Sequence, residues 1–258
     1  MAVLNVVRVK PAPVRSAGAM LRRLWLDESL YRDPAGRAWV VVEDQPRTPR
    51  AGANDKPVVV LGLSSRAEDL VDVGLAQEHQ VPVVRRFTGG GTVAVDGDAV
   101  LVSIACNAGG NSALAPYPRD VMHWTDVAWL RPSLEPLLRS GTSFLWRVNT
   151  PTMAYLKHPA KAPEYRSGRQ HHEFVRGLRD WFPAFDDEEE SRVRQDFVDA
   201  LIGGAARALR VDAVAEVIVD LNDDGNERAH AFPDAVRRTF SGLGIDVTQA
   251  NRSSLLRI

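Results

Sequence analysis

Short runs of β-branched residues alternate along the chain with longer amphipathic stretches, and these patterns predict strands and helices respectively. Strands are expected at residues 3–9, 38–43, 57–63, 92–95, 99–105, 141–148 and 216–221. Helices are expected at residues 17–32, 65–80, 118–138, 170–181, 191–209 and 231–243, with the third broken near Pro132. The order of these elements is not a regular strand–helix–strand series. We therefore expect an α+β (mixed α/β) fold.

One stretch between two apolar runs combines an arginine pair with three glycines. Residues 81–95 read VPVVRRFTGGGTVAV. Glycines let a ligand lie against backbone N–H groups, and successive N–H groups can form an anion-binding concavity. The guanidinium groups of Arg85 and Arg86 add donors suited to phosphate or carboxylate. An ordinary glycine-rich turn with two surface arginines is the alternative, because glycine runs alone are weak signals.

Two familiar nucleotide-binding patterns are missing from this stretch. The glycines are not followed by the Gly-Lys-Ser/Thr of a P-loop, and they lack the GxGxxG spacing of a dinucleotide fold. Further on, Asp96-Gly97-Asp98 separates the apolar runs 92–95 and 99–105. An Asp-Gly step in that position predicts a β-hairpin.

Composition narrows the class of protein. The chain has 258 residues, 45% of them hydrophobic, which suits one large domain or a domain with an appendage. The net charge of −1 favours neither a nucleic-acid nor a membrane partner, and no apolar run is long enough to span a bilayer. Five basic residues precede the first carboxylate, Asp27, as in an organellar presequence, although residues 3–9 read better as an opening strand.

Other chemically active side chains have ordinary explanations. Cys106 is the only cysteine, so an intramolecular disulfide and a cysteine zinc cluster are excluded. It could be a nucleophile, but a buried structural thiol is favoured. The triplet His171-His172-Glu173 looks like a metal motif, yet adjacent helical residues point in different directions. No metal site is expected.

Residues 85–96, RRFTGGGTVAVD, resemble the RR-x-[ST]-GGG-x-V pattern of the lipoate–protein ligase family. The likeness extends to LWLDE at 24–28, Cys106-Asn107 and PRDVM at 118–122. TSFLW at 142–146, MAYLK at 153–157 and APEYR at 162–166 resemble a plant and algal branch of the family. The match covers residues 3 to about 209.

This resemblance implies a fold and a reaction. The fold would be the catalytic domain shared with biotin–protein ligases, a largely antiparallel sheet flanked by helices, over residues 1–212. Residues 213–258 would form a short extension. The reaction would be activation of lipoate or octanoate with ATP and Mg²⁺ to an acyl-adenylate. Transfer would follow to a lysine of a lipoyl carrier domain, from a 2-oxoacid dehydrogenase or the glycine cleavage H protein. A soluble monomer, cytoplasmic or mitochondrial, is expected.

The resemblance also implies which residues form the site. The binding residues would be Arg85, Arg86, Thr88, Gly89, Gly90, Gly91 and Thr92. Arg86, more than Arg85, would offset the charge of the phosphate or carboxylate, and Thr88 would donate a hydrogen bond. Val93, Val95, Val100 and Val102 would either line an acyl tunnel or belong to the ordinary core. Some octanoyltransferases of this fold use a cysteine nucleophile, which keeps Cys106 as an alternative.

The sequence departs from the family in one segment. Family members carry K-[FI]-x-G-x-A before the TSFLW region, and its lysine contacts the carboxylate and the α-phosphate. Here Leu138-Arg139-Ser140 runs directly into Gly141, and none of Lys10, Lys56, Lys157 and Lys161 stands in such a context. The catalytic residue is therefore unknown, and an unpaired sheet edge is expected near residues 141–148.

Three explanations of that difference remain open. The chain is a catalytically impaired paralogue, an incomplete gene model or splice form, or a sequence with a loop removed. Two functions follow: an ATP-dependent ligase, or a non-catalytic acyl- or nucleotide-binding module of the same fold.

Overall fold

Two four-stranded sheets carry the fold. The computed structural model describes residues 2–11, 16–44, 56–106, 118–134, 145–158, 175, 177–182, 186–221, 232–249, 252–256 and 258. The first sheet has the order β6-β2-β1-β7, and the second has the order β5-β3-β4-β8. The first comprises β1 (Val3–Val9), β2 (Ala38–Asp44), β6 (Val100–Ala105) and β7 (Ala213–Val219). The second comprises β3 (Val58–Leu61), β4 (Val83–Arg85), β5 (Val93–Val95) and β8 (Ser254–Leu256).

Both sheets mix parallel and antiparallel pairs. In the first, β1 runs parallel to β2 and β7, whereas β2 runs antiparallel to β6. In the second, β3 runs parallel to β4, while β5 and β8 are antiparallel edge strands. The expected mixed α/β class is confirmed, with sheets that are mixed rather than largely antiparallel.

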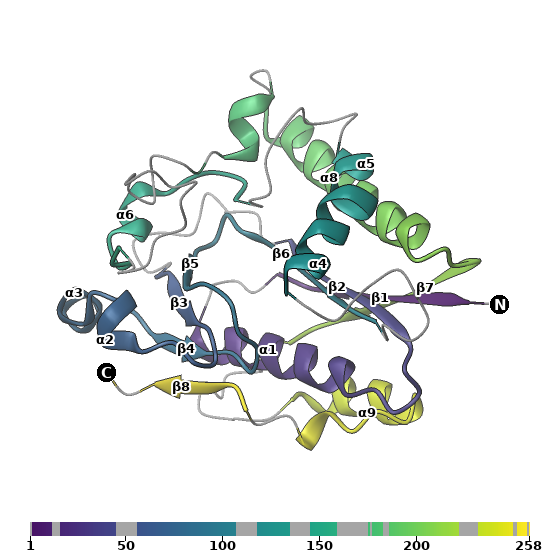
Figure 1. Ribbon diagram of the computed structural model, residues 1–258, viewed down its shortest axis with the longest axis horizontal. Coiled ribbons are helices and arrows are strands. Elements are labelled where there is room, and N and C mark those ends of the chain that lie inside the picture. The colour runs from purple at the N-terminus through teal and green to yellow at the C-terminus, as the bar shows by residue number, and fades with distance from the viewer. Residues whose placement is uncertain are drawn as a thin grey trace.

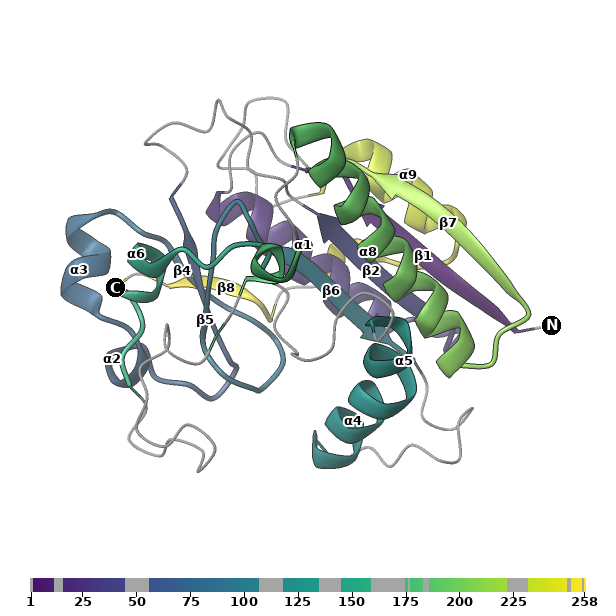
Figure 2. The same cartoon turned by 90° about the horizontal axis from the view of Figure 1, so that it is seen from above.

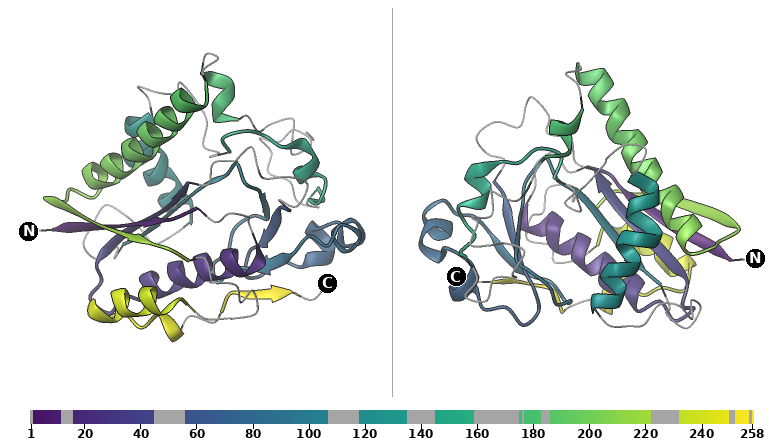
Figure 3. Two further views of the ribbon diagram at one scale, coloured as in Figure 1. Left: turned by 180° about the vertical axis from the view of Figure 1, so that it is seen from behind. Right: turned by 45° about the horizontal axis from the view of Figure 1, so that its top comes forward.

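Helices cover both faces of the first sheet, which explains why β1 and β2 are nearly continuous apolar runs. Val7 and Val41 belong to the core shared with α1 (Ala17–Tyr31) and α9 (Asp234–Gly242). Val6 and Val40 point the other way, to the core shared with α8 (Asp187–Ala208). Figure 3 shows α8 on one side of this sheet and α1 with α9 on the other.

Helix α1 occupies the middle of the molecule. Figure 1 shows it between the strands above and α9 and β8 below. Ser16 caps its first turn, since the Ser16 hydroxyl accepts a hydrogen bond from Ala19 N at 3.1 Å. Because α1 is enclosed on most sides, it buries even Arg22, Arg23 and Glu28. Such charges require partners, and those partners shape the site described below.

The acidic run at residues 186–190 opens α8. Asp186 forms a capping box with Glu189: its Oδ1 accepts from Glu188 N and Glu189 N at 3.0 and 2.9 Å. The helix begins at Asp187, four residues before the predicted start, because these acids belong to its first turn.

A single helical stretch packs beside α8 and contains the predicted break. It consists of α4 (Pro118–Trp124), the π-helical η2 (Thr125–Leu130) and α5 (Arg131–Leu134). Pro132 has no N–H to donate within the helix, and the wider turn of η2 precedes it. The remainder of the predicted helix, residues 135–138, lies outside the described residues.

The helix predicted at 65–80 is divided in two. It forms α2 (Ala67–Leu70) and α3 (Val73–Glu78), with Val71 extended between them. Val71 forms an antiparallel bridge with Leu156, just beyond α6 (Thr150–Met153). Pairing with this distant segment overrides the local helical pattern. Figure 2 shows α2, α3 and α6 together at the second-sheet end of the molecule.

The predicted hairpin at 92–105 is wrong in its pairing. Strand β5 pairs with β3 in the second sheet, whereas β6 pairs with β2 in the first. The Asp96-Gly97-Asp98 turn therefore carries the chain from one sheet to the other. Distant groups hold it there: Thr152 Oγ1 donates to Asp96 Oδ2 at 3.2 Å, and Arg147 and Arg194 form ion pairs with Asp98.

The structure describes only part of the region that follows residue 140, where the family lysine segment is missing. Residues 139–144 and 159–174 lie outside the described residues, and residues 178–181 form a 3₁₀ turn, η4 (Leu178–Trp181). Leu145 bridges Ala99, and Leu178 N donates to Leu145 O at 2.8 Å. The unpaired edge expected near 141–148 is therefore not present at Leu145, where the backbone is paired.

Residues 213–258, which follow the predicted domain boundary, contribute one strand to each sheet. They contain β7, α9, η5 (Val247–Gln249) and β8. Strand β7 pairs with β1 over seven residues, and β8 pairs with β4. The boundary after residue 212 thus falls at the start of a strand whose partner lies in the first ten residues.

Candidate functional site

A cavity of about 420 Å³ lies between α1 and strands of both sheets. One side is a stripe of α1 formed by Met20, Arg23, Leu24, Asp27, Leu30 and Tyr31. These positions recur every three to four residues and therefore share a helix face. Eleven residue steps separate the first from the last, so the cavity follows α1 for about 16 Å.

The opposite side is mainly apolar. It is formed by Val41 of β2, Val60 of β3, Val93 and Val95 of β5, and residues 101–105 of β6. Three of the four valines proposed for an acyl tunnel, Val93, Val95 and Val102, line the cavity. Val100 instead packs in the core beneath α8.

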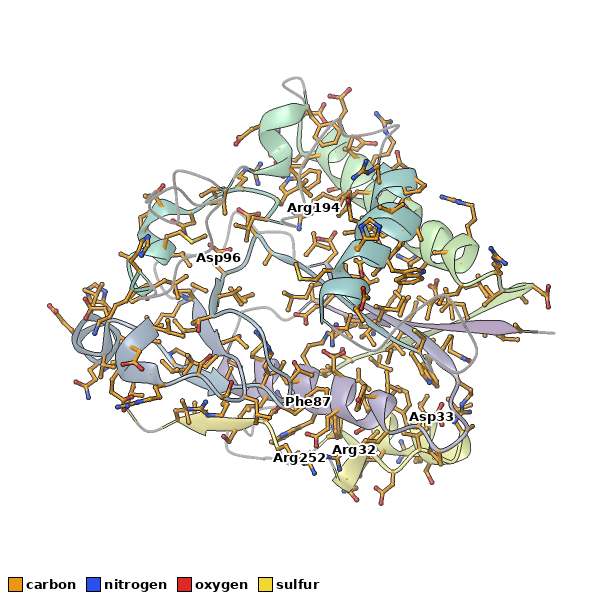
Figure 4. All side chains as sticks on the ribbon, in the orientation of Figure 1. Arg32, Asp33, Phe87, Asp96, Arg194 and Arg252 are labelled. Atoms are coloured by element: carbon orange, nitrogen blue, oxygen red, sulfur yellow. The ribbon has the colours of Figure 1, made fainter. Side chains whose placement is uncertain are left out.

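Residues 86–88, which directly precede the three consecutive glycines, close one end of the cavity. Arg86, Phe87 and Thr88 line it, and the rings of Phe87 and Tyr31 lie 5.9 Å apart at the C-terminal end of α1. In Figure 4, Phe87 lies over α1 near Arg32 and Arg252. Arg85, Gly89, Gly90, Gly91 and Thr92 do not line the cavity.

The glycine loop, residues 89–91, passes close to the turn after β3. Gly90 has φ of +102°, a conformation that favours glycine. A Cβ at Gly62 would collide with the Gly90 carbonyl oxygen, so both glycines are needed for this approach. A Cβ at Gly89 or Gly91 would meet no atom within 4 Å. The backbone at these two residues is therefore open to a ligand.

The two arginines hold different parts of the backbone. Arg86 wraps the loop: its Nε donates to Gly89 O at 3.0 Å, and its NH2 donates to Gly89 O and Gly91 O, both at 2.8 Å. Arg85 points away, and its NH1 donates to the carbonyls of Gly62, Leu63 and Ser65. Arg85 thus fixes the turn after β3, and Arg86 fixes the loop.

The charge of Arg86 has no acidic counterpart among the described residues. Burial lowers the pKa of its guanidinium, but arginine remains protonated at neutral pH. Its hydrogen bonds go to backbone carbonyls alone. Nearby, Thr92 Oγ1 is buried without a hydrogen-bond partner. This end of the cavity can attract an anion and offer it donors.

A buried ionic cluster lies farther along α1, and it was not predicted. Arg23 forms an ion pair with Asp27, and its Nε lies 3.7 Å from Glu43 Oε2. Ser103 of β6 donates to Asp27 Oδ2 at 2.9 Å and accepts from Arg23 NH2 at 3.1 Å. Arg23, Asp27 and Ser103 line the cavity. The signal in the sequence was a charged pair four residues apart on the apolar face of the helix.

No lysine of the described part of the chain lines the cavity. Lys10 pairs with Asp220, Lys56 donates to Gln80, and Lys157 donates to the Glu68 carbonyl. Lys161 and the junction at residues 138–141 lie outside the described residues.

Cys106 follows β6 and does not line the cavity, although Ala105 does. Burial raises the pKa of its thiol, which disfavours the reactive thiolate. The triplet 171–173 lies outside the described residues. Among those that are described, no three His, Cys, Asp or Glu side chains form a metal-binding group. None of the described helices is both long and apolar enough to cross a membrane.

Comparisons with known proteins agree on one family. Residues 38–124 match the model of the lipoyl protein ligase A/B catalytic domain. The chain is 30% identical over 73 residues to the inactive lipoate–protein ligase 2 of Plasmodium falciparum, a stretch that covers 28% of this chain and 19% of that relative.

Two solved structures share the fold at low sequence identity. One is a bipartite lipoate protein ligase from Thermoplasma acidophilum, described with its E2 lipoyl domain; the TM-score is 0.57 at 16% identity, and 93% of each chain is covered. The other is lipoate-protein ligase A bound with ATP, with a TM-score of 0.54 at 16% identity, covering 93% of this chain and 94% of the other. The chain is therefore similar to the lipoyl protein ligase catalytic domain over residues 38–124, which include the glycine loop, and it shares the fold of two solved lipoate–protein ligases.

Proposed function

We propose that the chain binds a carboxylic acid of the lipoate or octanoate kind in the cavity and activates it with ATP. The observation that carries this proposal is the asymmetry of the cavity. Its wall is mainly apolar, whereas Arg86 at one end has no carboxylate partner among the described residues. A carboxylate and a phosphate would meet at this end, and the chain of the acid would lie along α1.

The residues of the glycine loop fit an adenylate. Gly89 and Gly91 leave open space where a phosphate could lie against the backbone, and Thr88, which lines the cavity, offers a hydroxyl group. Arg86 would orient the carboxylate and offset the charge that develops. ATP supplies the activating phosphate when bound, and Mg²⁺ would accompany its phosphates. A solved relative in fold is bound with ATP, which supports this assignment.

The activated acyl group would pass to a lysine of a lipoyl carrier domain. The carbonyl carbon would bond to the lysine nitrogen, AMP would leave, and the amine would lose a proton. The Thermoplasma ligase is described with an E2 lipoyl domain. Carrier domains of 2-oxoacid dehydrogenases and the glycine cleavage H protein are the partners to test.

A catalytically impaired binding protein is the second candidate. The family lysine segment is missing from the sequence, and no lysine among the described residues lines the cavity. The Plasmodium falciparum protein that is similar to this chain over 73 residues is named as an inactive ligase. In this case the cavity and the loop would bind the acid or the nucleotide without joining them.

Exchange of pyrophosphate into ATP, dependent on lipoate or octanoate, tests the first candidate. Gly91→Ala should abolish exchange while leaving thermal stability unchanged, because its Cβ would fill only the open space at the loop. Gly242→Ala is the matched control, since a Cβ there also meets no atom and the residue ends α9. Unchanged exchange in Gly91→Ala would contradict ligand binding at the loop.

A second comparison distinguishes the active ligase from the impaired binding protein. A variant with a family lysine segment inserted after Ser140 should form adenylate on the order of 100- to 1000-fold faster than the natural chain if the lysine is required. Binding without exchange by the natural chain would favour the impaired protein. Equal, brisk exchange by both chains would show that the segment is dispensable.

A further inference from the structure

The three residues between β4 and the glycine loop, residues 86–88, are each held through a backbone group. Arg86 N donates to a carbonyl at the end of β3 at 2.9 Å, and Thr88 O accepts from the turn after β3 at 2.8 Å. Phe87 N donates to Ser253 Oγ at 3.1 Å, across 166 residues of sequence. Of these three anchors, the one at Phe87 depends on a side chain, so a substitution can remove it.

The hydroxyl of Ser253 takes the place of a backbone carbonyl of the sheet. The antiparallel register of β8 with β4 would place Arg252 opposite Phe87 if the pairing continued beyond the strand. Instead the chain turns onto α1, and Arg252 N donates to Glu28 Oε2 at 3.1 Å. The Phe87 N–H would be left without its sheet partner at this turn, and Ser253 Oγ supplies the acceptor.

The segment that carries Ser253 is fixed to α1. Ser253 is 2% exposed, and its carbonyl accepts from Trp25 Nε1 at 3.0 Å. The carboxylate of Glu28, which is 0% exposed, accepts from Arg252 N and pairs with Arg32 at 2.6 Å. Trp25 and Glu28 lie on a face of α1 different from the stripe that lines the cavity. Ser253 therefore connects the helix that forms one wall of the cavity to the residue that helps close its end.

Phe87 lies between the two polar residues at the end of the cavity that attracts an anion. Arg86 and Thr88 line the cavity on either side of it in the sequence, and Gly89 follows directly. The Phe87 ring also lies 5.9 Å from the ring of Tyr31, on the cavity side of α1. A displacement of the Phe87 backbone would therefore move the groups that face the ligand.

We propose that Ser253 is a positioning residue for the phosphate of the adenylate. Its hydroxyl holds the Phe87 backbone and thereby sets the glycine loop, residues 89–91, against the ligand, although Ser253 does not itself line the cavity. The proposal rests on the proposed function for the identity of the ligand. It adds a residue far from the glycine loop in sequence to those that determine binding.

A purely structural brace would have the same contacts, but it would affect ligands differently. A loss of stability reduces the fraction of folded chain, which lowers the apparent affinity for every ligand by the same factor. Displacement of the loop acts selectively, because the phosphate would lie against the loop and the acyl chain along α1. The ratio of the affinities for an acyl-adenylate and for the free acid therefore separates the two roles.

The first measurement compares octanoate with a non-reactive phosphonate analogue of octanoyl-adenylate by calorimetry. In Ser253→Ala the affinity for the analogue should fall about three- to tenfold relative to that for octanoate, the range expected for one lost hydrogen bond. Ser254→Ala is the matched control, since Ser254 is the exposed neighbour on β8, and it should keep the natural ratio. An unchanged ratio in Ser253→Ala would overturn the proposal and leave the proposed function intact. Failure of the natural chain to bind either ligand would contradict the proposed function itself.

Two further variants separate the hydroxyl from the stability of β8. Ser253→Thr keeps the hydroxyl and should keep the natural ratio, even if its added methyl lowers the melting temperature at this buried position. Leu256→Ala removes packing of β8 against the core around β3 and β4, so it should lower the melting temperature without changing the ratio. A ratio in Ser253→Thr as low as that in Ser253→Ala, or an equal fall in Leu256→Ala, would overturn the role of the Ser253 hydroxyl.

Discussion

At the residue scale, Arg85 and Arg86 show how neighbouring side chains can hydrogen-bond to different segments of the backbone. Successive side chains of a strand point to opposite faces, and Arg85 is the last residue of β4. Arg85 accordingly turns to the carbonyls after β3, while Arg86 turns to the glycine loop and the cavity. The sequence could identify both as anion-binding candidates. It could not show that both also fix backbone segments, because those carbonyls are distant or depend on the loop conformation.

Replacing Arg86 should affect ligand binding more than replacing Arg85. Arg86→Ala removes the cation at the end of the cavity and three hydrogen bonds to the loop. The affinity for a non-reactive acyl-adenylate analogue should fall by about tenfold or more. Arg85→Ala should mainly lower the melting temperature, since its contacts go to the turn after β3. Calorimetry and thermal unfolding measure the two effects, and equal affinities of Arg86→Ala and the natural chain would contradict this role.

Asp33 should make stability depend on pH in the acid range. Burial opposes its ionisation, but hydrogen bonds from Arg37, Trp39 Nε1 and Ala35 N outweigh burial and lower the pKa of Asp33 to about 2. The unfolded value is about 3.9. The contribution is therefore complete above about pH 4 and is lost as the pH falls toward 2; it amounts to roughly 2 kcal/mol.

Urea unfolding at a series of pH values measures this contribution. In Asp33→Asn the free energy of unfolding should lose the part of its pH dependence that belongs to Asp33. The neutral amide keeps the shape of the side chain. An identical slope in both proteins between pH 4 and 2 would show that other carboxylates cause the dependence.

At the element scale, the local sequence pattern correctly predicted the strands that are buried on both faces. The runs at 3–9 and 38–43 became β1 and β2, because burial on both faces requires little more than apolar, β-branched residues. The turn at 96–98 was misread because Arg147, Thr152 and Arg194 hold it. Contacts over such sequence distances leave no local signal.

The candidate site was partly predictable for the same reason. The glycine segment stands out in the sequence, since three consecutive glycines beside two arginines serve no ordinary helix or strand. The Arg23 and Asp27 pair did not stand out, because charges four residues apart on a helix are usually exposed. Only the fold shows that β2 and β6 enclose them.

Gly62 should be essential for the position of the glycine loop. A Cβ at this residue would collide with the Gly90 carbonyl oxygen, and Leu63 N donates to Thr88 O at 2.8 Å across the same contact. Gly62→Ala should therefore displace the loop and destabilise the protein by about 1–3 kcal/mol. Gly242→Ala, where a Cβ meets open space, should be nearly neutral. Thermal unfolding of the two variants decides this, and an equally stable Gly62→Ala would show that the loop can move away without loss.

At the scale of the whole molecule, the ends of the chain hold the two sheets together around α1. Strand β7 lies beside β1, and β8 lies beside β4. Between them, residues after 231 fill the core beneath α1, where Phe232 packs edge-on against Trp25 and Phe240 packs against Trp39. The cavity, which needs α1 and strands of both sheets, therefore depends on segments from the whole length of the chain.

Removal of residues 213–258 should prevent folding. The shortened chain would expose β1 and β4 as unpaired edges and would leave the apolar surface of α1 uncovered, with Trp25 Nε1 losing its acceptor at Ser253. We expect no cooperative thermal transition from residues 1–212. As a control, residues 1–212 and 213–258 produced together as separate chains should associate on a sizing column through the β1–β7 and β4–β8 pairs. A stable, cooperatively unfolding 1–212 fragment would instead make the predicted boundary after residue 212 a true domain boundary. It would also show that β7 and β8 are accessories to a core that α1 and the remaining strands complete by themselves.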